Sequence, residues 1–183
     1  MNLNIKYKAI IFDFDDTLFG TSHLQPLFDA IQKTKRGSEK NRQLWKEILA
    51  NTKNLKQYDG MEEVFNFIKT NEIKAVIVTD APKTRITPAI RYYHIPVIGA
   101  ITRFDCERKP SPEPILKGLE MLGCSCDDVL SVGNQLVDLA ATHAAGIKFA
   151  ACAWGMQEEE REELYKQADY IIENPIDLLT LFK

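Results

Sequence analysis

The sequence predicts an α/β fold, a Rossmann-like parallel sheet with helices on both faces and a small helical cap inserted after the first strand. Short apolar runs rich in β-branched residues alternate with segments of helical periodicity along most of the chain. This alternation is typical of βαβ units, whose strands form a parallel sheet covered on both faces. Residues 19–58 interrupt the alternation with helical periodicity alone, which indicates an insertion.

The first strand is expected over residues 9–12, because consecutive apolar residues with β-branched and aromatic members are typical of a buried strand. Three carboxylates follow directly, those of Asp13, Asp15 and Asp16. Side chains alternate along extended backbone, so Asp13 and Asp15 are expected on the same side. Neighbouring carboxylates repel unless a cation or a shared proton offsets them. The run therefore indicates a charged site, although a solvated turn capped by Asp16 or Thr17 is an alternative.

Two amphipathic helices are expected next. The first has apolar residues at the i, i+3, i+4, i+7 spacing of a helix face, namely Leu24, Leu27, Phe28 and Ile31. The second is expected over residues 39–50, after a break at Gly37. We therefore predict a small α-helical cap over residues 19–58 and a core domain made of residues 1–18 and 59–183.

The rest of the chain returns to alternating strands and helices. Strands are expected over residues 73–80, 96–101, 129–132, 147–153 and 169–172. Helices are expected over residues 61–68, after Pro82, over 115–122, in the alanine-rich run that ends at Ala145, over 158–166 and over 176–181. Ligands of such sheets bind at the carboxyl ends of the strands. Asp13, Thr79 and Asn134 fall at such ends, and Lys109 lies in a loop after another strand.

Composition excludes several classes of protein. The chain has 183 residues, 45% hydrophobic and 27% charged, as expected of one globular domain with a small insertion. Its net charge of −3 and the shortness of its densest basic stretch, residues 33–36, argue against a nucleic-acid partner. No apolar run approaches the roughly 20 residues needed to span a bilayer. No signal-peptide pattern is found either, so a cytoplasmic location is expected.

The four cysteines are expected to be reduced thiols, because disulfide frameworks belong mainly to small secreted chains. Cys124 and Cys126 have no second pair at zinc-site spacing, so no structural metal is expected there. The histidines stand apart in the sequence and are taken as structural or exposed.

The acidic run resembles the D-x-D-x-T nucleophile motif of the haloacid dehalogenase-like hydrolases. Asp13, Asp15 and Thr17 fill its three fixed positions. Thr79 matches the second motif of the family, a Ser or Thr that ends a strand, and Lys109 resembles the third.

Two further segments extend the resemblance over nearly the whole chain. Residues 133–138 are similar to the fourth motif, usually G-D-x-x-x-D. The loop at Trp154 and Gly155 and the stretch 168–170 are similar to the tail of phosphoglycolate phosphatase-like members, a less specific signal. Four motifs in the family's order are far more specific than any one of them.

The resemblance implies a Mg²⁺-dependent phosphatase that hydrolyses a phosphate monoester of a small metabolite. It implies that Asp13 is the nucleophile and forms an aspartyl-phosphate, while Asp15 protonates the leaving oxygen and then activates water. Thr79 and Lys109 would bind the transferring phosphoryl group. The implied metal ligands are Asp13, the main-chain carbonyl at Asp15, Asn134 and Asp138.

Asn134 departs from the family's pattern, since an Asp usually begins the fourth motif. An amide oxygen still ligates Mg²⁺, though less strongly than a carboxylate. Asp138 is one helical turn further on and could supply the missing charge directly or through water. We therefore predict a Mg²⁺ site that is weaker than a two-Asp version.

Other functions stay open on the same fold. Asp15 argues against dehalogenation, because dehalogenases of the family generally lack an acid at that position. Phosphomutases keep it but use a larger cap to exclude water, whereas a cap of residues 19–58 predicts an accessible pocket, with a second copy of the chain as a candidate partner. A non-catalytic phosphate-binding or regulatory module is the alternative from another class. For Asp80 we expect a helix-capping role.

Overall fold

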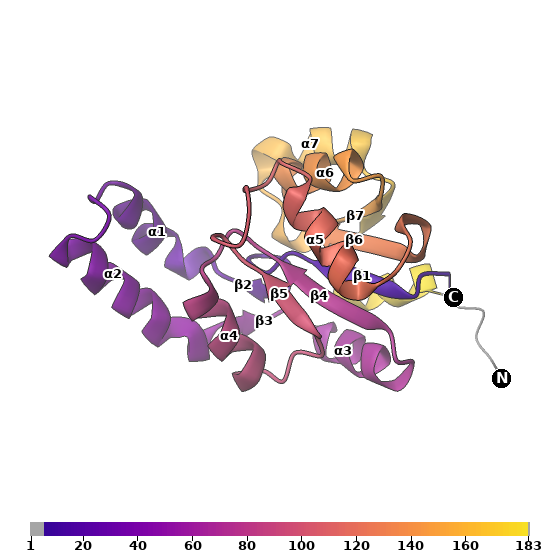
Figure 1. Ribbon diagram of the computed structural model, residues 1–183, viewed down its shortest axis with the longest axis horizontal. Coiled ribbons are helices and arrows are strands. Elements are labelled where there is room, and N and C mark those ends of the chain that lie inside the picture. The colour runs from indigo at the N-terminus through magenta and orange to yellow at the C-terminus, as the bar shows by residue number, and fades with distance from the viewer. Residues whose placement is uncertain (1–5, 183) are drawn as a thin grey trace.

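The computed structural model describes residues 6–182, which form a six-stranded parallel sheet in the order β5-β4-β1-β6-β7-β8 (Figure 1). The strands of this sheet are β1 Ala9–Phe12, β4 Lys74–Val78, β5 Gly99–Ile101, β6 Val129–Gly133, β7 Lys148–Cys152 and β8 Tyr170–Ile172. All five neighbouring pairs are parallel. The predicted fold class is therefore confirmed.

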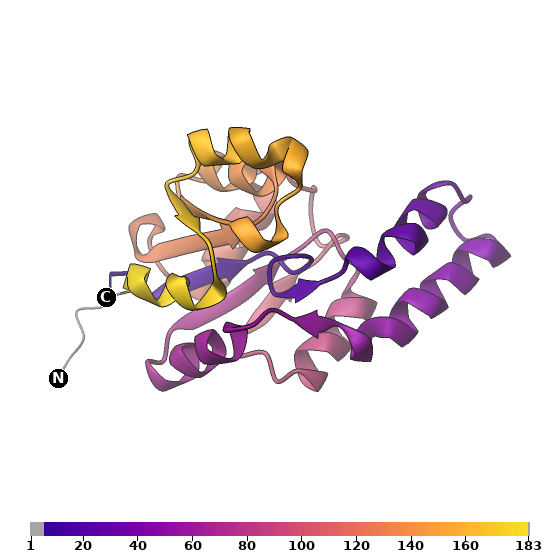
Figure 2. The same ribbon diagram turned by 180° about the vertical axis from the view of Figure 1, so that it is seen from behind.

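Helices cover both faces of the sheet (Figures 1 and 2). They are α3 Met61–Thr70, α4 Lys83–Tyr92, α5 Glu113–Leu122, α6 Leu136–Ala144 and α7 Glu158–Gln167. Alternate residues of β1 enter different cores, Ile10 and Phe12 packing with α3 and α4 while Ala9 and Ile11 pack with α5 and α6. This alternation is the direct consequence of strand geometry.

The central strands bring three polar residues to one edge of the sheet. In the register of β1, Phe12 lies beside Ile77 of β4 and Val132 of β6. Asp13 follows the first strand, Thr79 follows β4 and Asn134 follows β6. Since parallel strands end at a common edge, the residues expected to carry the chemistry begin as neighbours.

The insertion after β1 is a helical hairpin that projects away from the sheet (Figures 1 and 2). It contains α1 Gln25–Gln32 and α2 Glu39–Ala50. The Ser38 hydroxyl accepts a hydrogen bond from the Asn41 backbone N–H at 3.2 Å, a side-chain cap that explains why α2 begins at Glu39. At the base, β2 Phe19–Gly20 pairs with β3 Lys56–Gln57 in an antiparallel ribbon that the sequence does not predict.

Some elements differ from expectation. The strand expected from Pro96 begins only at Gly99, because the Val97 N–H donates to the Ile95 carbonyl in a turn and the pairing with β4 begins at Gly99. The C-terminal helix over residues 175–182 is a 3₁₀-helix. Asp80 caps no helix, since α4 begins after Pro82. The Asp80 carboxylate instead accepts hydrogen bonds from Arg108 at 2.6 and 2.8 Å, which corrects the capping expectation.

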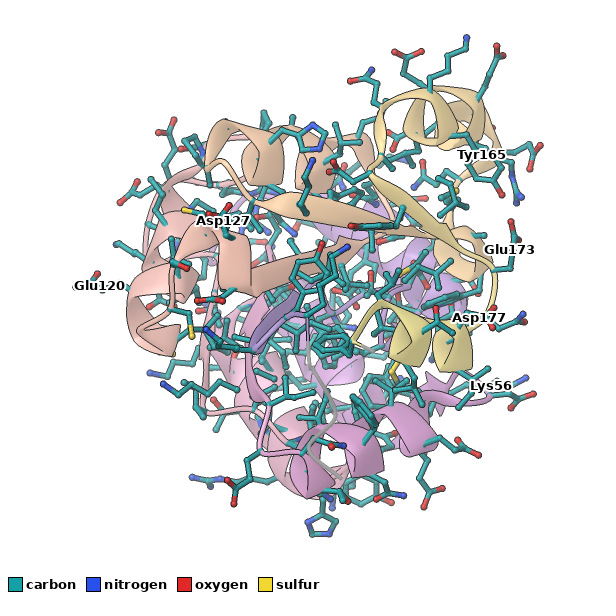
Figure 3. All side chains as sticks on the ribbon, turned by 90° about the vertical axis from the view of Figure 1, so that its right-hand side faces the viewer. Lys56, Glu120, Asp127, Tyr165, Glu173 and Asp177 are labelled. Atoms are coloured by element: carbon teal, nitrogen blue, oxygen red, sulfur yellow. The ribbon has the colours of Figure 1, made fainter. Side chains whose placement is uncertain are left out.

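The amino-terminal ends of the strands lie on the other side of the molecule from these polar residues. Figure 3 views the molecule from that side, and the labelled side chains of Glu120, Asp127 and Glu173 are exposed there. No helix within residues 6–182 combines the length and apolar character needed to cross a bilayer. The four cysteines are all free thiols, as expected.

Candidate active site

A buried lysine lies between two aspartates at the carboxyl edge of the sheet. Lys109 Nζ donates to Asp13 Oδ1 at 2.8 Å and to Asp138 Oδ1 at 2.5 Å. It also lies 3.3 Å from the carbonyl oxygen of Val78, the last residue of β4. The side chains of Lys109, Asp13 and Asp138 are only 4%, 11% and 6% exposed. Three residues that are far apart in the sequence therefore share one ion-pair cluster.

Burial and charge act in opposite directions on these groups. Burial raises the pKa of Asp13 to about 7, although the nearby Lys109 ammonium lowers it and Asp138 raises it further. Burial alone would lower the pKa of Lys109, but the two carboxylates outweigh it and the net shift is upward. The lysine is therefore a permanent positive charge. With both aspartates ionised, the cluster carries one excess negative charge, which favours binding of a cation.

The raised pKa of Asp13 predicts a measurable effect on stability. A carboxyl group with a raised pKa in the folded state favours folding below its unfolded pKa, and this contribution is lost as pH rises through the folded value. We expect metal-free Asp13→Asn to be more stable than the parent chain above pH 7, by about 1–3 kcal/mol. The gain should shrink as pH falls from 7 to 4.

Urea unfolding in EDTA at pH 8 and pH 5 checks this expectation. Asp127→Asn is a matched control, because its carboxylate is exposed on the opposite side of the molecule. A lower stability of Asp13→Asn than of the parent chain at pH 8 would contradict the assigned electrostatics.

The Asn134 amide is oriented by its neighbours. Its Nδ2 donates to the carbonyl oxygen of Gly155 at 2.7 Å, so its Oδ1 points the other way and accepts from the Thr17 hydroxyl at 3.1 Å. Gly155 can approach because it has no side chain: a Cβ atom there would lie 1.7 Å from the carbonyl oxygen of Asp16. The loop after β7 thus holds Asn134 with its oxygen toward the first motif.

Asp138 is fixed by the start of α6. Its Oδ2 accepts from the backbone N–H groups of Asn134 at 3.2 Å and Gln135 at 3.0 Å, and its Oδ1 accepts from Lys109. Both oxygens are engaged within the chain. This geometry therefore favours an indirect role, in which the negative charge of Asp138 attracts a metal ion, over direct ligation by Asp138.

The donors around Thr17 fit a hard cation. The Thr17 hydroxyl lies 3.1 Å from Asn134 Oδ1 and 3.4 Å from Asp13 Oδ2, so it brings one amide oxygen and one carboxylate oxygen close to each other. Mg²⁺ prefers such oxygen ligands. No group of three or more His, Cys, Asp or Glu side chains in the described part of the chain is arranged to hold a metal ion. Any metal site here therefore depends on mixed donors, including the amide.

Thr79 reaches the same edge, but within residues 6–182 it makes no hydrogen bond to the other candidates. Its Oγ1 accepts from the Ala81 backbone N–H at 3.1 Å, and the residue is 4% exposed. Lys109 contacts the carbonyl of the preceding Val78. The Thr79 oxygen accepts this bond, and its hydroxyl proton can still be donated to another group. Donation to a phosphate stays a prediction.

Asp15 has a partner that the sequence does not reveal. Arg85 donates from Nη1 to Asp15 Oδ2 at 2.6 Å and from Nη2 to Asp15 Oδ1 at 2.5 Å. The two residues are 70 positions apart, and no local pattern marks an arginine near the start of a helix as a partner of the first motif.

Comparison with known proteins places this chain in a family. The family model described as haloacid dehalogenase-like hydrolase matches residues 23–152. The match begins after Thr17, so the roles of Asp13 and Asp15 depend on their own motif. A phosphoglycolate phosphatase of Xylella fastidiosa (strain 9a5c) is 28% identical over 128 residues, covering 66% of this chain and 54% of that protein. The pyrophosphatase PpaX of Bacillus cereus (strain AH820) is 28% identical over 130 residues, covering 69% and 60%.

This chain thus spans only somewhat over half the length of these relatives. A solved structure of a HAD-superfamily hydrolase, subfamily IA, variant 1, from Geobacter sulfurreducens PCA superimposes with a TM-score of 0.73 at 20% identity. The superposition covers 100% of this chain and 99% of that one, and it establishes a shared fold. With a family model matching most of its length, the chain belongs to the haloacid dehalogenase-like hydrolases.

Proposed function

We propose that the protein is a Mg²⁺-dependent phosphatase that hydrolyses a phosphate monoester of a small metabolite. The observation that carries this proposal is the Lys109 ammonium held between Asp13 and Asp138 at the carboxyl edge of the sheet. A buried nucleophilic carboxylate beside a fixed cation suits attack on an anionic phosphorus centre, because the cation offsets the repulsion between nucleophile and substrate.

The chain's own residues supply the steps of a covalent mechanism. An Asp13 carboxylate oxygen attacks phosphorus, the bond to the leaving oxygen breaks, and the phosphoryl group is transferred to Asp13. Lys109 stabilises the charge that develops on the phosphoryl oxygens, and Thr79 offers a hydroxyl donor. Asp15 protonates the leaving oxygen and then removes a proton from the water that hydrolyses the aspartyl-phosphate.

Asp13, Asn134 and the main-chain carbonyl of Asp15 would hold Mg²⁺, with Asp138 adding negative charge nearby. The proximity of Asp13 Oδ2 and Asn134 Oδ1, which both lie within 3.4 Å of the Thr17 hydroxyl, supports this ligand set. When bound, the ion supplies positive charge that reduces repulsion between the substrate and the carboxylates.

The relatives suggest which substrates to try first. Two are named for phosphoglycolate and for pyrophosphate, so these compounds belong at the head of a screen of small phosphorylated metabolites. Four free thiols support a reducing compartment such as the cytoplasm.

The first experiment is hydrolysis of p-nitrophenyl phosphate with Mg²⁺ and with EDTA. Turnover that requires Mg²⁺ is expected. One observation favours a second candidate, a non-catalytic phosphate-binding module: Asn134 stands where the family usually has an acid. Absence of turnover with p-nitrophenyl phosphate and with every compound in the screen would favour that module.

Asn134→Asp should bind Mg²⁺ about tenfold more tightly than the parent chain, because a third carboxylate is added beside those of Asp13 and Asp138. The substitution also removes the Nδ2 donation to Gly155 and places two acceptor oxygens together. Without metal, the variant should therefore lose about 1–2 kcal/mol of stability.

Calorimetric titration of Mg²⁺ and urea unfolding in EDTA measure the two effects separately. Asn66→Asp, at an exposed site in α3, is the control for added charge. Unchanged Mg²⁺ affinity in Asn134→Asp would count against Asn134 as a ligand.

A further inference from the structure

Arg85 is the most deeply buried charged side chain that the proposed chemistry does not use. It lies in the first turn of α4, is 1% exposed, and binds Asp15 through both terminal nitrogens at 2.5 and 2.6 Å. A guanidinium that meets a carboxylate with two parallel hydrogen bonds fixes the plane of that carboxylate as well as its position.

The apolar surroundings of Arg85 make its burial unfavourable in free energy. Its Nε is buried without a hydrogen-bond partner. The guanidinium carbon lies 5.5 Å from the ring centre of Phe14 and 5.3 Å from that of Phe28, so aromatic rings take the place of polar neighbours. Well-packed apolar residues often stabilise a protein as well as a buried ion pair does. Stability alone therefore does not account for this arginine.

The two ends of the pair differ in their access to solvent. The side chain of Asp15 is 30% exposed, whereas that of Arg85 is 1% exposed. The Arg85 guanidinium therefore binds Asp15 from the protein interior. Each carboxylate oxygen keeps a further lone pair for a group that arrives from the open side.

We propose that Arg85 is a positioning residue, which holds the Asp15 carboxylate in the orientation needed to transfer a proton to the leaving oxygen. Phe28 lies in α1 of the hairpin, so its ring links the placement of the cap to the placement of Asp15. The inference rests on the proposed phosphatase function and adds to it a residue that acts through Asp15.

The dependence on the leaving group separates positioning from general structural damage. Phenyl phosphate and p-nitrophenyl phosphate have similar shapes, but phenolate is the poorer leaving group and needs more help from an acid. If Arg85 orients Asp15, replacing Arg85 must slow the hydrolysis of phenyl phosphate more than the hydrolysis of p-nitrophenyl phosphate. If Arg85 only stabilises the fold, both substrates must slow by the same factor.

The experiment measures kcat and KM for both substrates in Arg85→Gln, Arg85→Lys and Asp15→Asn. In Arg85→Gln we expect kcat/KM, which reports transfer of the phosphoryl group to Asp13, to fall about 10- to 100-fold for phenyl phosphate and by a smaller factor for p-nitrophenyl phosphate. Arg85→Lys keeps the charge but not the two parallel hydrogen bonds, so it should recover only part of kcat/KM. The double variant Asp15→Asn/Arg85→Gln should show no more substrate discrimination than Asp15→Asn alone, because the two residues act as a unit.

Two further variants test whether the effect is specific to Arg85 and its aromatic neighbour. Arg91→Gln removes an exposed arginine from the same helix and should leave the hydrolysis of both substrates unchanged. Phe28→Leu should produce the same selective loss as Arg85→Gln, to a smaller degree. Circular dichroism confirms that each variant is folded at the assay temperature.

Two outcomes would overturn the inference, and they are distinguishable. An equal loss of kcat/KM on both substrates in a folded Arg85→Gln, with an active parent chain, would overturn the positioning role and leave the phosphatase proposal intact. A parent chain that hydrolyses neither substrate, nor any other phosphate monoester, would overturn the phosphatase proposal and this inference with it.

Discussion

Asp13→Asn should lose about 10⁴-fold or more in kcat while the chain stays folded. An amide cannot attack phosphorus as a carboxylate does, and no other carboxylate in the cluster is free to replace it. Asp138 is engaged by Lys109 and by two backbone N–H groups. The loss should appear in kcat for every substrate, whatever its leaving group, and steady-state kinetics with Mg²⁺ measures it.

Asp16→Asn is the matched control for this result. Asp16 belongs to the same acidic run, but its carboxylate accepts from the Thr21 backbone N–H at 2.7 Å and from the Thr21 hydroxyl at 3.1 Å. Its role is in the turn before the cap, so its replacement should change kcat by about tenfold at most. Substantial turnover by purified Asp13→Asn would exclude Asp13 as the nucleophile.

Lys109→Met should have the largest effect on stability, together with loss of turnover. Removing the ammonium leaves the buried carboxylates of Asp13 and Asp138 without their shared cation. Breaking one side of a buried ion pair costs about 3–5 kcal/mol, a large part of the roughly 5–15 kcal/mol that stabilises a typical domain. Urea unfolding in EDTA gives the value directly.

A double variant shows whether repulsion between the carboxylates is the cause. Lys109→Met/Asp13→Asn removes one of the two negative charges and should recover part of the lost stability, without recovering turnover. Lys117→Met is the control, because Lys117 is partly exposed and lies 3.4 Å from Glu113. Exposed pairs of this kind contribute about 1 kcal/mol or less. Equal stabilities of Lys109→Met and Lys117→Met would contradict the electrostatic account.

Much of the fold could be predicted because local patterns and tertiary packing agree. The helix expected over residues 39–50 is α2 Glu39–Ala50, where a Ser38 cap defines the start. The helix with apolar residues Met61, Val64, Phe65 and Ile68 buries all four of them. Periodicity detects such elements since the buried face repeats with the helix.

Elements whose formation depends on distant partners could not be predicted in the same way. The ribbon of β2 and β3 has two residues in each strand, too few for any periodicity. The start of β5 at Gly99 depends on where β4 offers hydrogen-bond partners. Pro88 lies inside α4, at an exposed position where the carbonyl it leaves unpaired can face water.

The candidate site shows the same division. Asp13, Lys109, Asn134 and Asp138 were identified by motif, and three of them meet in one ion-pair cluster. Arg85 was missed because its partner Asp15 is 70 residues away. The orientation of the Asn134 amide depends on the Gly155 carbonyl, which only the folded chain brings within reach.

The central claim is that the Asp13 carboxylate becomes covalently phosphorylated. Mass spectrometry of an acid-quenched reaction tests it most directly, after borohydride reduction has converted any aspartyl-phosphate to homoserine. With Mg²⁺ and substrate, the modified residue should be Asp13, and Asp15 and Asp16 in the same peptide should be unmodified. Modification at another residue, or rapid turnover with Asp13 never modified, would contradict the account.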